Sequence, residues 1–239
     1  RAYRTVNRRS LRRLLLTGGL TTLFVHSTAF KSRLVSYGVE PDRIRTIPDP
    51  VDIPDERPTK EKAREQLDLP DQDLVLLFFG GFRHDKGTDI LLEAIRTMDY
   101  QELSVVFAGS PENTTEQDVR EVQNAVPDGR VILRAEFIPH DLVNQYFAAS
   151  DAVILPYRSE YSGTSGILQR AAAMNRPVIA TAVGEVGPTV EQNELGIVVE
   201  PDSVSALQRG IQQYRDNREE IETMVDRQAV RYAKANSYE

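Results

Sequence analysis

A loop of small residues, Ser162-Gly163-Thr164-Ser165-Gly166, is the part of this sequence best suited to bind an anion. It follows an apolar run at residues 152–156, which predicts a buried strand, and precedes an alanine-rich segment at 167–174, which predicts a helix. Glycines let a ligand approach the backbone, and the start of a helix offers free N–H groups at the positive end of its dipole. The same pattern also fits an ordinary tight connection in an α/β domain.

Arg83 and Lys86 lie in a second glycine-containing loop, residues 80–87, which also follows an apolar segment. Arginine can hold two oxygens of a phosphate, and lysine adds a point charge. Combined with the start of the helix after the first loop, they could cradle a diphosphate. They would then stabilise the charge that develops on a nucleoside diphosphate leaving group, without a metal. The alternative is that both are surface charges paired with Asp85 or Asp89.

The elements that position these loops form a regular alternation of apolar strands and helices. This alternation predicts an α/β fold with a doubly wound, parallel sheet that is covered by helices on both faces. Ligands of such sheets bind beyond the carboxyl ends of the strands, where both loops are expected. The predicted strands are 74–79, 103–108, 131–133, 152–155, 177–180 and 196–199.

The first fifty residues differ from the rest. A strand at 22–25, a helix at 29–37 and a strand at 44–47 precede a segment with three prolines, residues 48–54. Such a segment is a stiff connector, and we place a domain boundary there, between residues 1–52 and 53–239.

Charge is distributed unevenly between the two ends of the chain. Residues 1–46 carry ten basic and two acidic side chains, hence +8, and since the whole chain carries −7, the remainder carries −15. Residues 1–16 can form a basic amphipathic helix, which would contact an anionic membrane surface or a partner, or pack its apolar side on another part of the protein. The acidic remainder argues against nucleic-acid binding.

Composition also limits the chemistry. The chain has no cysteine, which excludes disulfides and thiolate sites, and its three histidines are far apart, which argues against zinc. No metal site is therefore expected. No apolar run approaches the roughly 20 residues of a membrane span, and no signal peptide is evident. We expect a cytoplasmic protein, with the basic N-terminal segment as a candidate peripheral membrane contact.

Several segments in the same order resemble the glycogen-synthase-like "group 1" glycosyltransferases of GT-B fold. Residues 79–87 followed by 91–94 resemble the loop and helix after the first strand of that family's C-terminal, donor-binding domain. Ser27 and residues 39–52 resemble the end of the family's first domain and its linker. Further matching segments are 107–109, 137–139, 148–156, 176–181 and 196–201.

The resemblance implies a Rossmann-like nucleotide-sugar-binding domain from residue 53, the C-terminal half of a GT-B fold. It implies that Arg83 and Lys86 hold the donor diphosphate, that the backbone near Phe137 and Ile138 contacts the base, and that transfer retains the anomeric configuration. No cofactor or metal would be required besides the nucleotide-sugar donor. The donor-binding residues implied are Gly80, Gly81, Gly109, Phe137, Ile138, Glu160, Ser162, Gly163, Thr164, Ser165, Gly166 and Arg170.

The sequence departs from the family where the donor sugar and ribose are usually held. Two glutamates separated by seven residues are replaced by Ser162 and Arg170, and a third falls at Pro188. Glu160 or Glu185 could substitute, and Arg170 would lie near the ribose or meet an additional anion.

Other departures concern single positions and the ends. Asn175 replaces a usual glycine, which is tolerable because asparagine accepts left-handed backbone. Only about fifty residues of the family's first domain precede the linker, and relatives continue beyond the C-terminus. We therefore expect either a fragment or a donor domain that needs a partner.

Three functions remain open from the sequence. The leading one is glycosyl transfer from a nucleotide sugar to an unknown acceptor, with this chain supplying the donor-binding half. The second is a non-catalytic nucleotide-sugar-binding or assembly module that has lost the acidic residues. The third is a sugar-nucleotide epimerase, which would need an acid/base group in the cleft, where only His84 is near.

Overall fold

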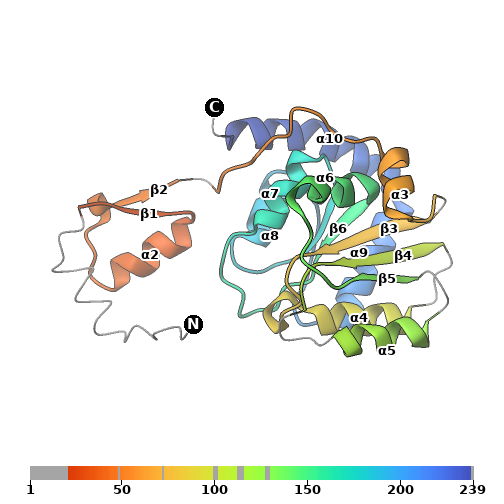
Figure 1. The fold of residues 1–239 in the computed structure, drawn as a ribbon. Coiled ribbons are helices and arrows are strands. Elements are labelled where there is room, and N and C mark those ends of the chain that lie inside the picture. Colours follow the sequence, from red (N-terminus) through yellow and green to blue (C-terminus); the bar gives the residue numbers. More distant parts are fainter. Residues whose placement is uncertain are drawn as a thin grey trace. The chain divides into compact units, whose positions relative to one another are not determined.

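The computed structural model divides the chain into two compact units, Arg1–Asp49 and Pro50–Glu239, each of which is described by itself. Its elements are shown in Figure 1. The structure describes residues 21–47, 49–71, 73–98, 102–111, 116–126 and 130–237. The basic helix expected at residues 1–16 lies outside the described residues, so that prediction stays a prediction.

The first unit contains the strand–helix–strand motif that the sequence predicts. Strand β1 (Leu23–Val25) pairs in parallel with β2 (Ile44–Thr46), and α2 (Thr28–Ser36) and the short helix η1 (Pro41–Arg43) lie between them in the chain. Ser27 caps α2, because its hydroxyl accepts a hydrogen bond from the Phe30 N–H at 3.0 Å. The small core of this unit consists of Val25, Leu34, Val39 and Ile44.

The second unit is built on six parallel strands in the order β5-β4-β3-β6-β7-β8. This confirms the predicted doubly wound sheet. The strands are predominantly apolar, as expected for a parallel sheet that helices cover on both faces. Their bounds are β3 (Leu74–Phe79), β4 (Leu103–Ala108), β5 (Val131–Arg134), β6 (Ala152–Leu155), β7 (Val178–Thr181) and β8 (Gly196–Val199).

The strand order reverses between β3 and β6, which pair through Leu76 with Ala152 and Leu77 with Val153. The chain first moves outward from β3 to β4 and β5, then returns to β6 beside β3. Ligands of open α/β sheets bind at the carboxyl ends of the strands next to such a reversal. The two loops singled out from the sequence leave the sheet at this place.

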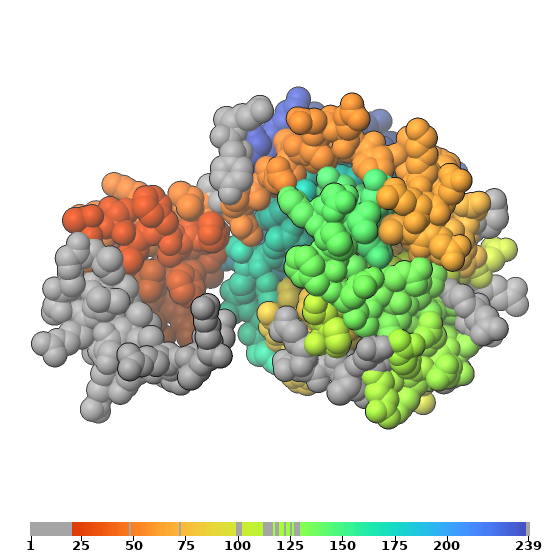
Figure 2. Space-filling model, viewed as in Figure 1, coloured from red at the N-terminus to blue at the C-terminus, as the bar shows by residue number. Residues whose placement is uncertain are grey.

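Helices form a layer on each side of the sheet (Figure 1). Helix α3 packs on α6, and the two lie side by side on the surface, orange and green in Figure 2. On the same side α7 packs on α10, whereas α4 packs on α5 and α9. The helices are α3 (Lys60–Leu67), η2 (His84–Lys86), α4 (Thr88–Thr97), α5 (Glu116–Ala125), α6 (His140–Ala149), α7 (Gly166–Ala173), α8 (Val186–Gln192), α9 (Val204–Asp216) and α10 (Arg218–Ala235).

The proline-rich segment is fastened to the second unit at Val51. This side chain is 1% exposed and clusters with Ala173 of α7 and Ala233 of α10. The Val51 N–H donates to the Asn236 carbonyl at 2.9 Å. The segment is therefore packed on the helices at Val51.

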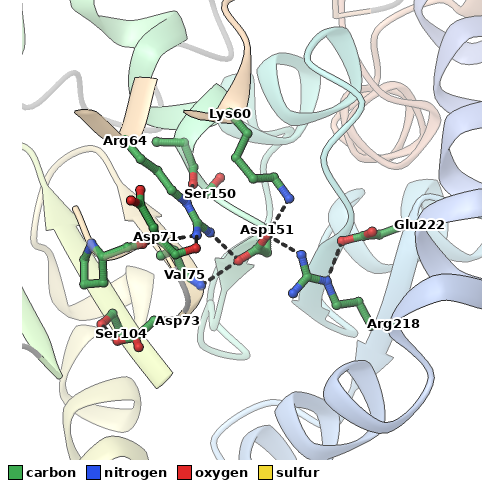
Figure 3. A network of polar contacts seen from close by, with 12 residues as sticks. Lys60, Arg64, Asp71, Asp73, Val75, Ser104, Ser150, Asp151, Arg218 and Glu222 are labelled. Atoms are coloured by element: carbon green, nitrogen blue, oxygen red, sulfur yellow. Dashed lines mark hydrogen bonds and ion pairs between the residues drawn. The ribbon is translucent and has the colours of Figure 1, made fainter. Parts of the chain in front are cut away.

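Asp151, directly before β6, joins three elements at the amino end of the sheet (Figure 3). Its side chain is fully buried and accepts hydrogen bonds from Lys60 Nζ at 2.6 Å, Arg64 Nη2 at 2.7 Å and Arg218 Nη2 at 2.6 Å. The Val75 N–H of β3 donates to it at 2.7 Å. The carboxylate thereby connects α3, α10 and β3 to β6.

The pKa of Asp151 reports the balance of these contacts. Burial raises this pKa, but the hydrogen bonds from Lys60 and Val75 and the charges of Lys60 and Arg218 outweigh burial, so that it lies below the ordinary value of 3.8. A carboxyl whose pKa is depressed on folding stabilises the protein above its unfolded pKa. It loses that contribution as pH falls through the folded value.

Asp151→Asn should therefore lower the free energy of unfolding at pH 7 by about 3–5 kcal/mol, because it leaves three cations without their buried counter-charge. Urea unfolding at pH values from 7 to 3 measures this. The difference between wild type and variant should shrink below pH 4. Asp71→Asn is the matched control, since Asp71 is exposed and contacts Arg64 through its backbone carbonyl. An equal loss in both variants would contradict the assignment.

Candidate functional site

The loop after β3 is held by its aromatic residue and by its last glycine. Phe82 is fully buried, and its N–H donates to the Ser110 carbonyl at 3.0 Å. Gly87 has φ +66°, and a Cβ there would lie 1.9 Å from the carbonyl oxygen of Pro156, directly after β6. Only glycine permits this approach. The backbones of the loops after β3 and β6 are thus in direct contact.

Lys86 points from the first loop to the second. Its ammonium nitrogen lies 3.8 Å from the ring centroid of Tyr157 and 4.7 Å from that of Tyr161. Both distances are within the range of a cation–π interaction. One of the two predicted diphosphate-binding residues is therefore directed toward the small-residue loop.

Arg83 forms the ion pair that the sequence offered as the alternative. Its guanidinium donates from Nε and Nη2 to the two carboxylate oxygens of Asp85, at 2.9 and 2.8 Å. These hydrogen bonds hold the pKa of Asp85 below its ordinary value of 3.8. Both side chains are about one-third exposed, so an anion could compete for the guanidinium. Asp89 pairs with Arg158 instead.

The small-residue loop leads into α7, which Ser165 caps and whose first residue, Gly166, faces open space. The Ser165 hydroxyl accepts from the Leu168 N–H at 3.4 Å and lies 2.9 Å from the Tyr157 hydroxyl oxygen. A Cβ on Gly166, the first residue of α7, would meet nothing within 4 Å. A Cβ on Gly163, which is exposed, would have the Tyr161 side chain as its nearest neighbour, at 3.5 Å. The start of α7 at Gly166 therefore faces open space, and the loop before it is exposed at Gly163.

Arg158 fastens the same loop to its surroundings. It forms ion pairs with Asp89 of α4 and, at 3.1 Å, with Asp202 in the turn before α9. The Asp202 carboxylate also accepts from the Ser159 N–H at 3.2 Å. The hydrogen bond of the Ser159 side chain, and after it that of the Ser159 backbone, lower the pKa of Asp202. The loop is held at its base while its glycine tip stays open.

The loop after β7 supports the small-residue loop from the other side. Gly184 has φ +51°, and the Glu185 N–H donates to the Gly163 carbonyl at 3.4 Å. Of the two acids that could substitute for the family glutamates, Glu185 thus has its backbone beside Gly163. Glu160 is exposed, and its carboxylate lies 3.9 Å from His84 Nε2.

A cavity of about 200 Å³ opens at the carboxyl ends of β3 and β4. Gly109, with φ +142°, is required here because a Cβ would lie 2.0 Å from the Gly80 carbonyl oxygen. Phe137 is 81% exposed at the cavity, whereas Ile138 is buried. Five predicted donor-binding residues and three that the sequence did not indicate line it: Gly80, Gly81, Gly109, Phe137 and Ile138, with Phe79, Ser110 and Val143.

Arg170 lies one turn into α7 and has partners of its own. Its guanidinium donates to Asn144 Oδ1 at 3.2 Å and to Asp52 Oδ2 at 3.3 Å. Its charge is thus engaged by the linker segment. Asn175, after the same helix, has φ +51°, which confirms the left-handed backbone expected there.

Sequence reasoning missed Tyr157 and Tyr161 as functional residues. Both tyrosines precede the small-residue loop and are four residues apart, but their contact with Lys86 joins segments about seventy residues apart in the chain. Among the described residues, no three His, Asp or Glu side chains gather in a way that could hold a metal ion. In the same part of the chain, every helix is too short or too polar to cross a bilayer.

Comparison with known sequences identifies the family of the chain. A family model described as "Glycosyl transferases group 1" matches residues 73–217. D-inositol 3-phosphate glycosyltransferase 1 of Catenulispora acidiphila is 31% identical over 174 residues, which cover 69% of this chain and 41% of that protein. Glycogen synthase of Thermodesulfovibrio yellowstonii is 30% identical over 145 residues, 60% of this chain and 28% of that protein. The chain thus spans less than half the length of these relatives.

Solved structures share the fold. Sucrose-phosphate synthase from Thermosynechococcus elongatus matches with a TM-score of 0.80 and 23% identity, over 96% of this chain and 57% of that chain. Anabaena Alr3699/HepE in complex with UDP-glucose matches with a TM-score of 0.78 and 19% identity, over 96% of this chain and 62% of that chain. The parallel, Rossmann-like sheet is that of GT-B glycosyltransferase structures.

The sequence match and the fold agree on one assignment. The matched region runs from just before β3 to the end of α9, so it includes the whole six-stranded sheet and all the loops of the site. It covers more than half of the chain. This chain belongs to the group 1 glycosyltransferases.

Proposed function

We propose that this chain binds the nucleoside diphosphate of a sugar nucleotide and supplies the donor-binding half of a retaining glycosyltransferase. One observation carries the proposal. The Lys86 ammonium lies on the tyrosines that precede the exposed start of α7, and the cavity beside Phe137 opens at the carboxyl ends of the adjacent strands β3 and β4. The match to a fold solved with UDP-glucose bound supports the same reading.

The base, the diphosphate and the sugar of the donor would each bind a different part of the site. The base would enter the cavity and stack on Phe137, since aromatic rings bind the π-face of any base. The diphosphate would lie between Lys86 and the start of α7, where N–H groups and the helix dipole favour negative charge. The sugar would lie over Ser162–Thr164, near Glu185.

The chemistry that these groups assist is departure of the diphosphate. The bond from the anomeric carbon to the diphosphate oxygen breaks, and its electron pair stays on the diphosphate. The acceptor hydroxyl oxygen forms the new bond to that carbon, and its proton passes to the departing diphosphate. Fixed cations and N–H groups that meet the leaving oxygen stabilise the charge as it develops. No cofactor or metal takes part in this scheme.

Replacing Arg83 and Lys86 together by Ala should weaken UDP binding by about 2–4 kcal/mol, because charge-assisted contacts to the diphosphate are lost. Titration calorimetry with UDP, GDP and ADP measures this and selects the base. The matched control is Lys62→Ala with Arg96→Ala, which removes the same charge from two exposed side chains of α3 and α4. Unchanged binding in the Arg83/Lys86 variant would refute the phosphate role.

Asp85→Asn should have the opposite effect on UDP. It removes the carboxylate that accepts two hydrogen bonds from the Arg83 guanidinium and would compete with the diphosphate for it. We expect UDP to bind several-fold more tightly than to wild type, and the gain to vanish when Arg83 is also replaced by Ala. If Asp85→Asn weakens UDP binding, Asp85 does not compete with the diphosphate for Arg83, and this assignment is wrong.

Phe137→Ala should weaken UDP binding by about 1–3 kcal/mol through lost stacking. Because Phe137 is 81% exposed, the variant should keep its thermal stability. Pyrophosphate, which has no base, should bind wild type and variant equally in calorimetry. A similar loss for pyrophosphate and UDP would place Phe137 at the phosphates and not at the base.

A second candidate function is a non-catalytic nucleotide-sugar-binding or assembly module. The observation that favours it is the absence of glutamates at Ser162, Arg170 and Pro188, together with the engagement of Arg170 by Asp52. Incubation of the full-length protein with a panel of sugar nucleotides decides between the two. Release of nucleoside diphosphate, by transfer or hydrolysis, would exclude the non-catalytic module, and binding without any release would favour it.

A further inference from the structure

Two tyrosines form a seat for the Lys86 ammonium group. Besides the distances of 3.8 and 4.7 Å from the ammonium to their ring centroids, the rings of Tyr157 and Tyr161 lie 4.5 Å from each other and are tilted by 48°. The cation thus meets the electron-rich faces of two rings that also pack on each other. We call these two side chains the tyrosine seat.

The tyrosine seat is hydrogen-bonded to the loop that faces the open helix end. The Tyr157 hydroxyl lies 2.9 Å from Ser165 Oγ, the cap of α7, and the Tyr161 hydroxyl donates to the Thr164 carbonyl. The Tyr157 backbone carbonyl accepts from Thr181 Oγ1 at 2.6 Å. Burial raises the pKa of the Tyr157 hydroxyl, which keeps it protonated for these contacts.

The two rings differ in freedom. Tyr157 is 1% exposed and has no room to turn away, whereas Tyr161 is half-buried at the edge of the open space. The position of the ammonium is therefore set by the same side chains that set the loop before α7. A lysine side chain has four rotatable bonds, and fixing it before a ligand arrives removes part of the entropy cost of binding.

We propose that Tyr157 and Tyr161 are positioning residues for Lys86, which hold its ammonium in register with the α7 N-terminus so that both meet one diphosphate. This rests on the proposed function, in which Lys86 contacts the donor diphosphate. The tyrosines act through Lys86 and need not touch the donor. The seat makes a mobile lysine part of a prearranged site.

The resting position of Lys86 can be observed without any ligand. The chain has only five lysines, Lys31, Lys60, Lys62, Lys86 and Lys234, so a spectrum of lysine labelled with ¹³C at Cε shows few signals, and Lys86→Arg assigns one. Ring currents should shift the Lys86 ε-methylene protons upfield of the others. Tyr161→Leu should reduce this shift and Tyr161→Phe should keep it. An unshifted Lys86 signal in the wild type would overturn the proposal.

UDP binding then tests whether the seat acts through Lys86. Tyr161→Leu should weaken UDP binding about 3- to 30-fold, the range of a cation–π contact, and Tyr161→Phe, which keeps the ring, should restore most of the affinity. In a Lys86→Ala background, Tyr161→Leu should have no further effect. Tyr232→Leu is the matched control, because Tyr232 is also half-buried and bonds to Gln169 of α7 at 2.8 Å.

The outcomes separate this proposal from the proposed function. If UDP binds and Tyr161→Leu weakens its binding by the same factor in the wild-type and Lys86→Ala backgrounds, Tyr161 does not act through Lys86. The proposal is then wrong. If Tyr161→Leu tightens UDP binding, the rings compete with the diphosphate for the ammonium, and the proposal is also wrong. If the chain binds none of UDP, GDP and ADP, the proposed function fails first and the positioning role falls with it, whatever the Lys86 signal shows.

Discussion

The close backbone approach of Gly87 to Pro156 is the constraint on which the site depends. It joins the loop after β3 to the loop after β6 with no room for a side chain between them. Because β3 and β6 are neighbours only where the strand order reverses, this contact exists in one place in the sheet. Because the two loops touch here, Lys86 of the first loop lies against Tyr157 and Tyr161, which lead into the small-residue loop before α7.

The two ends of the sheet are built differently. At the amino end, the Asp151 network is buried, and several charges converge on one carboxylate. At the carboxyl end, Gly163 is exposed and Gly166 faces open space, and the ion pairs of Arg158 hold the base of the loop. Stability and ligand access are thus assigned to opposite ends, as is common where a rigid scaffold carries functional loops.

The sheet could be predicted because buried parallel strands appear in a sequence as short apolar runs separated by helices. Residues 74–79 and 103–108 were predicted with the bounds that β3 and β4 have in the structure. The gathering of Gly80, Gly109 and Phe137 at one cavity was implied by resemblance, since their spacing alone does not place them together. By contrast, the position of the loops at the carboxyl edge of the sheet could be predicted, because all strands of a parallel sheet end at the same edge.

Partner choices within the site could not be predicted. Arg83 could meet a ligand or Asp85, and the loop conformation, not the residue types, decides this pairing. Lys86 contacts Tyr157, and Arg170 contacts Asp52. Each contact joins segments far apart in the sequence, so no local sequence pattern predicts it. Sequence periodicity reports which residues are buried, but not which polar groups find each other.

The Asp151 network also constrains the order in which the second unit can be completed during synthesis. Its carboxylate is bonded to Lys60, 91 residues earlier, and to Arg218, 67 residues later. Contacts over such separations form late, because the intervening chain must first be brought together. A nascent chain that has exposed α3 and β6 but not yet α10 still lacks one of the three cations. Helix α10 therefore completes the Asp151 network at the end of the sheet opposite the site, and the ribosome delivers it after the six strands of this sheet.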